Sequence, residues 1–114
     1  MNFSIDKQEN YTLVKVTVDK LDTTVAPSLK SELVMLNAHG SKNLIIDMSG
    51  TRYCDSSGLS VLLVANRLCK NVGGTFVLSG IQKSVEKLIH ISQLDTVLNI
   101  TTSIEDAAAL IQKN

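Results

Sequence analysis

Apolar residues recur along this chain with two different periods, which predict alternating strands and helices. Short runs rich in Val, Ile and Leu, either alternating with polar residues or continuous, are typical of strands. Apolar positions spaced three and four residues apart are typical of helices that bury one face. The strands are expected at residues 3–7, 11–18, 43–48, 75–78 and 96–100. The helices are expected around residues 25–36, 57–71, 85–89 and 104–111.

The order of these elements, β-β-α-β-α-β-α-β-α, predicts an α/β fold in a single domain over residues 1–114. Strands that alternate with helices pair in parallel, because each helix returns the chain to the same end of the sheet. The first two strands are joined by a short turn at Glu9 and Asn10, and we therefore expect them to form an antiparallel hairpin. The result is a mixed sheet of four to five strands packed with about four helices.

Residues with special backbone or capping properties mark the expected helix ends. Thr23 or Thr24 is placed to act as the N-cap of the first helix, and Gly40 is placed to end it. Ser103 and Asp106 have the spacing of a capping box at the start of the last helix. These signals agree with the hydrophobic pattern, and they strengthen the predicted order of elements.

Composition narrows the function classes without choosing among them. Eleven basic and eleven acidic residues balance to zero net charge, which disfavours a nucleic-acid binder. Cys54, Cys69, His39 and His90 are isolated from one another in sequence, so we expect no metal site and no cofactor. Residues 1–9 lack the apolar segment of a signal peptide, and no apolar run is long enough to span a bilayer. These features predict a cytoplasmic protein with reduced thiols.

The segment between the third strand and the second helix is the most informative part of the chain. Asp55, Ser56, Ser57 and Gly58 connect the end of a strand to the start of a buried helix, where α/β folds tend to place functional groups. We expect Ser56 at or just before the N-cap. Unpaired backbone N–H groups at a helix start can receive a phosphate, whether bound or attached to a side chain. The alternative interpretation is that Asp and Ser serve only as ordinary capping residues.

The run Asp55-Ser56-Ser57-Gly58-Leu59 closely resembles the signature of STAS domains in bacterial anti-sigma factor antagonists. The resemblance extends over essentially the whole chain. Matching features in the same order are Leu21-Asp22, residues 44–48, Val72-Gly73-Gly74 and Ser92-Gln93-Leu94.

This resemblance implies a protein-binding switch. The unphosphorylated protein would bind an anti-sigma factor, usually a serine kinase with a GHKL-type ATP site, and thereby release a sigma factor. The kinase would phosphorylate Ser56, with Ser57 as the alternative acceptor, and a PP2C-type phosphatase would reverse the reaction. The implied partner-binding residues are Asp22, Asp55, Ser56, Ser57, Gly58 and Leu59.

Two features depart from this pattern, and two rival functions remain. Ser60 stands where close relatives often carry Gly, and residues 18–22 lack the Gly-Glu pair that often precedes Leu-Asp. One rival is a STAS subunit of a lipid-transport ABC complex or another non-sigma STAS interaction module, although the lipid-transport subunits usually lack a clean Asp-Ser-Ser-Gly run. The other is an enzyme with Ser56 as its nucleophile. That reaction would need a nearby base and an orienting acid, and no Gly-x-Ser-x-Gly motif is present. We therefore expect a binding protein without catalytic activity.

Overall fold

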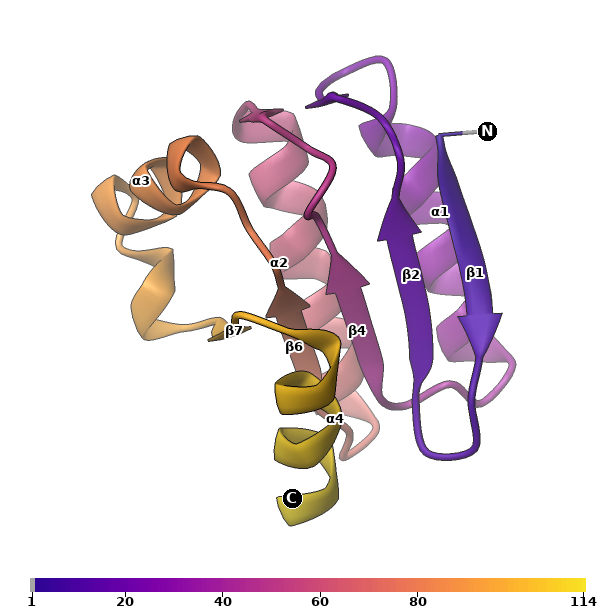
Figure 1. Ribbon diagram of the computed structural model, residues 1–114. Coiled ribbons are helices and arrows are strands. Elements are labelled where there is room, and N and C mark those ends of the chain that lie inside the picture. Colours follow the sequence, from indigo (N-terminus) through magenta and orange to yellow (C-terminus); the bar gives the residue numbers. More distant parts are fainter. Residues whose placement is uncertain (1) are drawn as a thin grey trace.

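The computed structural model describes residues 2–114, which form a mixed sheet with helices on both faces (Figure 1). The five strands lie in the order β1-β2-β4-β6-β7. β1 is antiparallel to β2, and the other neighbouring strands are parallel. The strands span Phe3–Lys7 (β1), Thr12–Val16 (β2), Leu44–Asp47 (β4), Phe76–Ser79 (β6) and Asn99–Thr101 (β7). A separate pair of two-residue strands, β3 (Lys20–Leu21) and β5 (Tyr53–Cys54), is also parallel.

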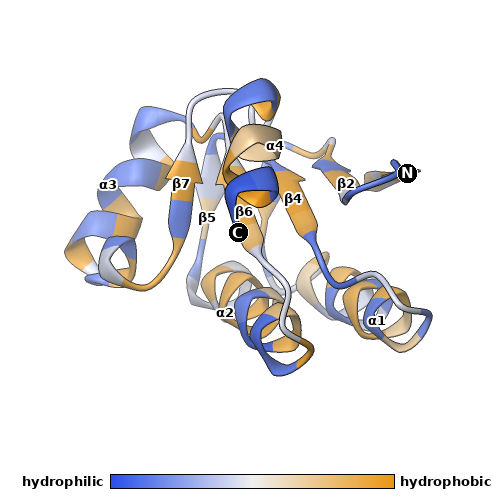
Figure 2. Cartoon of the chain, turned by 90° about the horizontal axis from the view of Figure 1, so that it is seen from below, coloured by the Kyte–Doolittle hydropathy of each residue, from blue (hydrophilic) through white to orange (hydrophobic). Residues whose placement is uncertain are grey.

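The helices divide between the two faces and one edge of the sheet. α1 (Ala26–Ala38) and α2 (Ser56–Asn71) lie side by side under one face, while α4 (Ile104–Lys113) lies on the other (Figure 2). α3 (Lys83–Ile91) and the short 3₁₀ helix η1 (Leu94–Thr96) stand beyond the β7 edge. This arrangement places the start of α2 at the end of the sheet where the parallel strands finish.

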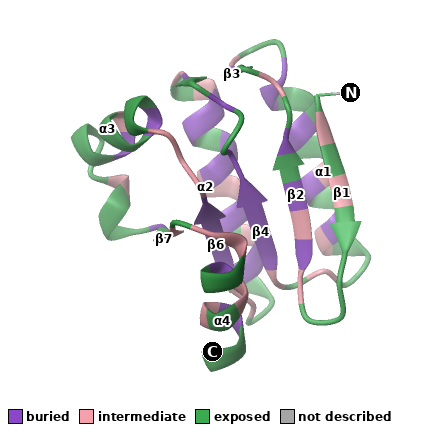
Figure 3. Ribbon diagram, in the orientation of Figure 1, coloured by how far each residue is buried: buried purple, intermediate pink, exposed green. Residues whose placement is uncertain are grey.

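Alternate residues of the central strands supply two apolar layers, as expected for a strand covered on both faces. Leu44 and Ile46 belong to the large core shared with α1 and α2. Ile45 belongs to a smaller cluster that includes Ala107 and Ile111 of α4. All four residues of β4 and all four of β6 are buried, which makes these strands the centre of the domain (Figure 3). A change of register by one residue would exchange the two layers.

The α/β fold and the main order of strands and helices confirm the sequence prediction. The predicted end of α1 is also confirmed, since Gly40 has a φ of 97° and the Ser41 N–H donates to the carbonyl of Leu36. At α4, the Ser103 side chain accepts from the Asp106 N–H at 3.1 Å. Asp106 itself accepts instead from the Thr102 hydroxyl, so only half of the predicted capping box is seen.

Two local predictions were wrong, and one strand pairing was not predicted. The N-cap of α1 is Val25, without a side-chain cap, because the Thr24 N–H and hydroxyl both donate to the Asp22 carboxylate. The last strand begins at Asn99, because the chain first forms η1. The pairing of β3 with β5 was not anticipated, since neither two-residue strand produces a recognisable hydrophobic period.

Candidate functional site

The segment predicted to carry function begins α2, and Asp55 fixes its geometry. Asp55 is the N-cap in an extended conformation, and its carboxylate accepts from the Gly58 N–H at 3.1 Å. The sequence prediction placed Ser56 at or before the N-cap, but Ser56 is the first residue inside the helix. The reason is that the Asp55 carboxylate is the acceptor that reaches the third N–H of the helix, which is the usual N-cap geometry.

Ser56 and Ser57 differ in how far they are exposed. Ser56 is exposed and Ser57 is half-buried. Both occupy the first turn, where backbone N–H groups have no partner within the helix and carry partial positive charge. The backbone carbonyl of Ser56 accepts from the Ser60 hydroxyl at 3.0 Å. The Ser56 hydroxyl is therefore the more accessible acceptor for a modifying group, at a helix end that favours negative charge.

The short β3–β5 pair brings a second loop beside this helix start. Leu21 pairs with Cys54, and the Asp55 N–H donates to the Leu21 carbonyl at 3.3 Å. Asp22 follows β3 as Asp55 follows β5, so the two acidic residues leave neighbouring strand ends. The Thr24 hydroxyl lies 2.6 Å from the Asp22 carboxylate, and this hydrogen bond lowers the pKa of Asp22 below its ordinary value. Asp22 consequently carries a negative charge near the Ser56 loop at neutral pH.

Gly58 lets the two loops approach each other. A Cβ atom at this position would lie 2.5 Å from the Cys54 Sγ and 2.6 Å from the Leu21 carbonyl oxygen. Both distances are shorter than real Cβ atoms show, so a larger residue would push the first turn of α2 away from β3 and β5. The glycine is thus required by close backbone packing, independently of any role in partner binding.

A groove of about 410 Å³ opens directly beside Ser56, between the start of α2 and α3. Ser56 and Leu59 lie on one wall, and Leu88 lies on the other. The remaining lining residues are Arg52, Tyr53, Cys54, Asp55, Ser84 and Ser92. Asp55, Ser56 and Leu59 on the α2 side were among the residues singled out from the sequence, whereas the lining residues from α3 were not. The two sides of the groove are brought together only by the tertiary fold. The amphipathic period of α3 was the one available signal, and it does not indicate which face lines a groove.

Arg52, which was also missed, is held at the mouth of this groove. Its guanidinium contacts the Asp19 carboxylate at 2.7 Å and 3.0 Å, and the Asp19 carbonyl accepts from the Arg52 and Tyr53 N–H groups. The hydrogen bond from Arg52 lowers the pKa of Asp19. This exposed ion pair links the loop before β3 to the loop before β5.

The chemistry available at the site is that of binding and modification. Cys54 is buried, and its thiol pKa is raised to about 12. Burial is the larger cause of this rise, and the nearby charge of Asp55 is the smaller one. A neutral thiol is a poor nucleophile, so Cys54 serves here as a small buried apolar group. Within residues 2–114, no three His, Cys, Asp or Glu side chains gather in a way that could hold a metal ion. In the same part of the chain, every helix is too short or too polar to cross a membrane.

Comparison with known proteins identifies the family. The family model described as the STAS domain matches residues 2–107. The anti-sigma-B factor antagonist of Bacillus subtilis (strain 168) is 28% identical over 106 residues, which cover 92% of this chain and 96% of that protein.

Two solved structures show the same fold over nearly the whole chain. An anti-sigma factor antagonist from Mycobacterium paratuberculosis has a TM-score of 0.84 at 22% identity, covering 96% of this chain and 92% of that one. The Bacillus cell fate determinant SpoIIAA in its phosphorylated form has a TM-score of 0.74 at 17% identity, covering 95% of this chain and 98% of that one. At these identities the structural similarity establishes the fold and leaves the function to be argued from the site.

Proposed function

The chain belongs to the STAS domain family, and from this premise we propose that it is an anti-sigma factor antagonist controlled by phosphorylation of Ser56. The unphosphorylated form binds an anti-sigma factor and releases a sigma factor, and the phosphate switches this binding off. The observation that carries the proposal is the exposed hydroxyl of Ser56 on the first turn of α2, beside a groove that a partner can enter. The similarity to the Bacillus subtilis anti-sigma-B factor antagonist supports the choice of partner.

The physics of such a switch requires no change of fold. A phosphate adds about −1.5 to −2 charge at neutral pH. The first-turn N–H groups of α2 offset part of the repulsion from Asp22 and Asp55, so the phosphorylated domain remains folded. The same dianion lies at the mouth of the groove, where a partner surface shaped for a hydroxyl would meet it. A loss of about 3 kcal/mol in binding free energy lowers affinity more than a hundredfold.

The partner face that we propose consists of the loop after β3, the start of α2 and the groove between α2 and α3. Ser56 accepts the phosphate, and Ser57 is the less accessible alternative. Asp55 supplies negative charge at the groove and Asp22 supplies it in the neighbouring loop after β3, while Leu59 supplies an apolar contact inside the groove. Gly58 acts by keeping the two loops together. The chain acts as one STAS domain over residues 1–114, and it works by binding, with no catalysis of its own.

The enzymes that set the phosphorylation state are separate proteins. The proposed kinase is the anti-sigma factor itself, a serine kinase that uses ATP, and a PP2C-type phosphatase removes the phosphate. Since sigma factors act on RNA polymerase inside the cell, we place the chain in the cytoplasm.

A pull-down with the Ser56→Ala variant as bait tests the proposal. The variant cannot be phosphorylated at Ser56, so it should retain an anti-sigma factor kinase from an extract of the native cell. The captured kinase and ATP should then place one phosphate on wild-type protein, which peptide mass spectrometry should map to Ser56. The matched Ser57→Ala variant should be phosphorylated like the wild type. Phosphate mapped only to other residues, or capture of partners that are not anti-sigma factors, would refute the proposal.

A further inference from the structure

Tyr53 is the one exposed aromatic side chain in the part of the chain that the structure describes. The chain has two Phe, two Tyr and no Trp. Phe76 is buried in the core, and Phe3 and Tyr11 are half-buried. Tyr53 is 51% exposed and lines the groove beside Ser56. A large ring, half in contact with water, therefore lies next to the residue that we propose as the phosphate acceptor.

The backbone at Tyr53 is held from two sides. Toward β3, the Tyr53 N–H donates to the Asp19 carbonyl at 3.1 Å, and Tyr53 pairs with Lys20. Toward α3, the Ser84 hydroxyl donates to the carbonyl of the preceding residue, Arg52. Because a Tyr side chain has two χ angles, ordering it on a fixed backbone loses little conformational entropy. Tyr53 is thus suited to burying a large area when a partner binds.

An interface centred on Ser56 includes Tyr53. A specific interface covers about 800 Å² of each partner, which is a patch with a radius of about 16 Å if it is treated as a disc. Tyr53 and Ser56 are three residues apart in the chain, so their Cα atoms are separated by at most about 11 Å. Both residues line the same groove. A kinase that reaches the Ser56 hydroxyl therefore covers the Tyr53 ring as well.

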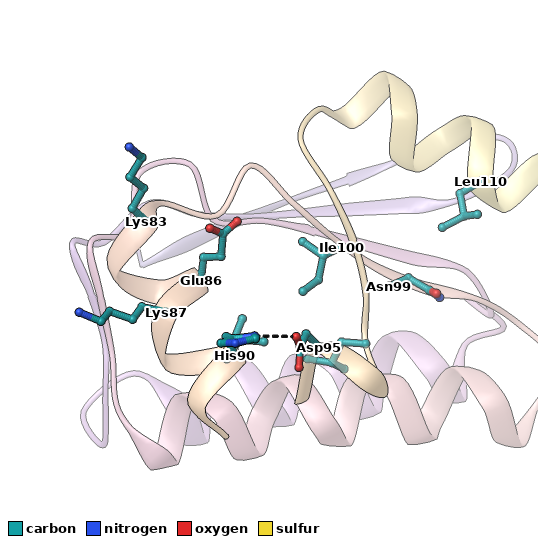
Figure 4. A pocket seen from close by; sticks show the side chains of 10 residues that line it. Lys83, Glu86, Lys87, His90, Asp95, Asn99, Ile100 and Leu110 are labelled. Carbon is teal, nitrogen blue, oxygen red and sulfur yellow. Dashed lines mark hydrogen bonds and ion pairs between the residues drawn. The ribbon is translucent and has the colours of Figure 1, made fainter. Parts of the chain in front are cut away.

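α3 also borders a second cavity, which has no comparable side chain. This cavity of about 720 Å³ lies between α3 and β7 (Figure 4). Its lining residues, all within the described part of the chain, include no Phe, Tyr or Trp. Lys83 and Lys87 extend from α3 away from the cavity (Figure 4). Of the two cavities beside α3, the Ser56 groove is the one with an exposed aromatic ring.

We propose that Tyr53 is an aromatic anchor for the anti-sigma factor, and that its ring enters an apolar pocket on this partner. The inference rests on the proposed function, and it adds a binding residue to Asp22 and residues 55–59. Residues that dominate binding energy are enriched in Tyr, Trp and Arg, and they lie near the centre of an interface. The half-exposed ring has apolar area left to bury, and its burial strengthens binding without a part in phosphate transfer.

Calorimetric titration of Tyr53 variants into the kinase captured by Ser56→Ala tests the proposal. Tyr53→Thr removes the ring but retains a β-branched residue suited to a strand, and it should bind about thirtyfold more weakly than the wild type. Tyr53→Phe retains the ring and should bind within about threefold of the wild type. Wild-type affinity of Tyr53→Thr would overturn the proposal. An equal loss in both variants would assign the binding to the hydroxyl and would overturn the apolar pocket.

Val72→Ala is the matched control for a loss of exposed apolar surface. Val72 is 48% exposed, but it follows the last residue of α2, about 24 Å from Ser56 along the helix axis. This variant should bind like the wild type. Equal losses in Tyr53→Thr and Val72→Ala would contradict an anchor at Tyr53.

Labelling of the wild type with 3-fluorotyrosine tests the anchor without a change of sequence. The two ring signals belong to Tyr11 and Tyr53, and Tyr53→Phe identifies them by ¹⁹F NMR. The kinase should shift the Tyr53 signal and leave that of Tyr11, which precedes β2 at the opposite end of the sheet, in place. An unshifted Tyr53 signal in a complex that phosphorylates Ser56 would overturn the anchor alone. Failure of Ser56→Ala to capture an anti-sigma factor would refute the proposed function, and the anchor with it.

Discussion

Replacing Gly58 by Ala is the sharpest test of how the site is assembled. In an unconstrained helix this change stabilises the helix by up to about 1 kcal/mol, because Ala has the higher helix propensity. Here the new Cβ would lie 2.6 Å from the Leu21 carbonyl oxygen and 2.5 Å from the Cys54 Sγ. The Leu21 carbonyl already accepts from the Asp55 N–H, so it cannot move without disturbing the pairing of β3 with β5.

The steric cost should exceed the gain in helix propensity. Overpacking of a well-packed interior costs about 1–3 kcal/mol, and contact with a backbone atom belongs at the upper end. The net destabilisation is then about 1–2 kcal/mol. For a domain of this size, that loss lowers the melting temperature by about 4–8 °C. Separation of the loops would also move Asp22 away from Ser56, so partner binding should weaken in protein that remains folded.

Scanning calorimetry of Gly58→Ala and Gly50→Ala side by side measures the effect. Gly50 is the matched control, because the nearest heavy atom to a Cβ there is the Val16 carbonyl oxygen at 3.8 Å, an ordinary contact. Its variant should stay within about 0.5 kcal/mol of the wild type. A melting temperature of Gly58→Ala equal to or above that of the wild type would show that the close approach does not constrain α2, and the reasoning would fail.

Other predictions concern the cap and the buried thiols. Asp55→Ala should cost about 1 kcal/mol in urea unfolding, because the Gly58 N–H loses its acceptor, whereas Asp55→Asn should retain most of the stability. Cys54 and Cys69 should react slowly with iodoacetamide at pH 8 unless the protein is unfolded, since burial raises their thiol pKa values to about 12 and about 11. Stability should also fall as pH rises from the ordinary thiol pKa of 9.0 toward these values, because the unfolded chain then releases protons that the folded chain retains. A Cys54→Ala/Cys69→Ala variant with the same decline would contradict this assignment.

The sequence by itself determined the layers of the fold, because hydrophobic period depends on local geometry. The continuous apolar run of residues 44–46 is typical of a strand at the centre of a sheet covered on both faces. The amphipathic spacing of Leu29, Leu33 and Leu36 orients α1 toward the same core. The location of Ser56 at the start of a buried helix also followed from the local pattern, to within one residue of its observed place.

Only the tertiary structure decided which distant segments share a surface. The pairing of β3 with β5 places Asp22 beside Asp55, yet two-residue strands have too few positions to show a period. The wall that Leu88 contributes to the Ser56 groove depends on where α3 lies relative to the sheet. These arrangements depend on packing between residues that are far apart in the chain. Such contacts do not appear in the local spacing of apolar and polar residues. The start of α2 could therefore be predicted from the sequence, whereas the surface that the loop after β3 and α3 form around it could be identified only from the tertiary structure.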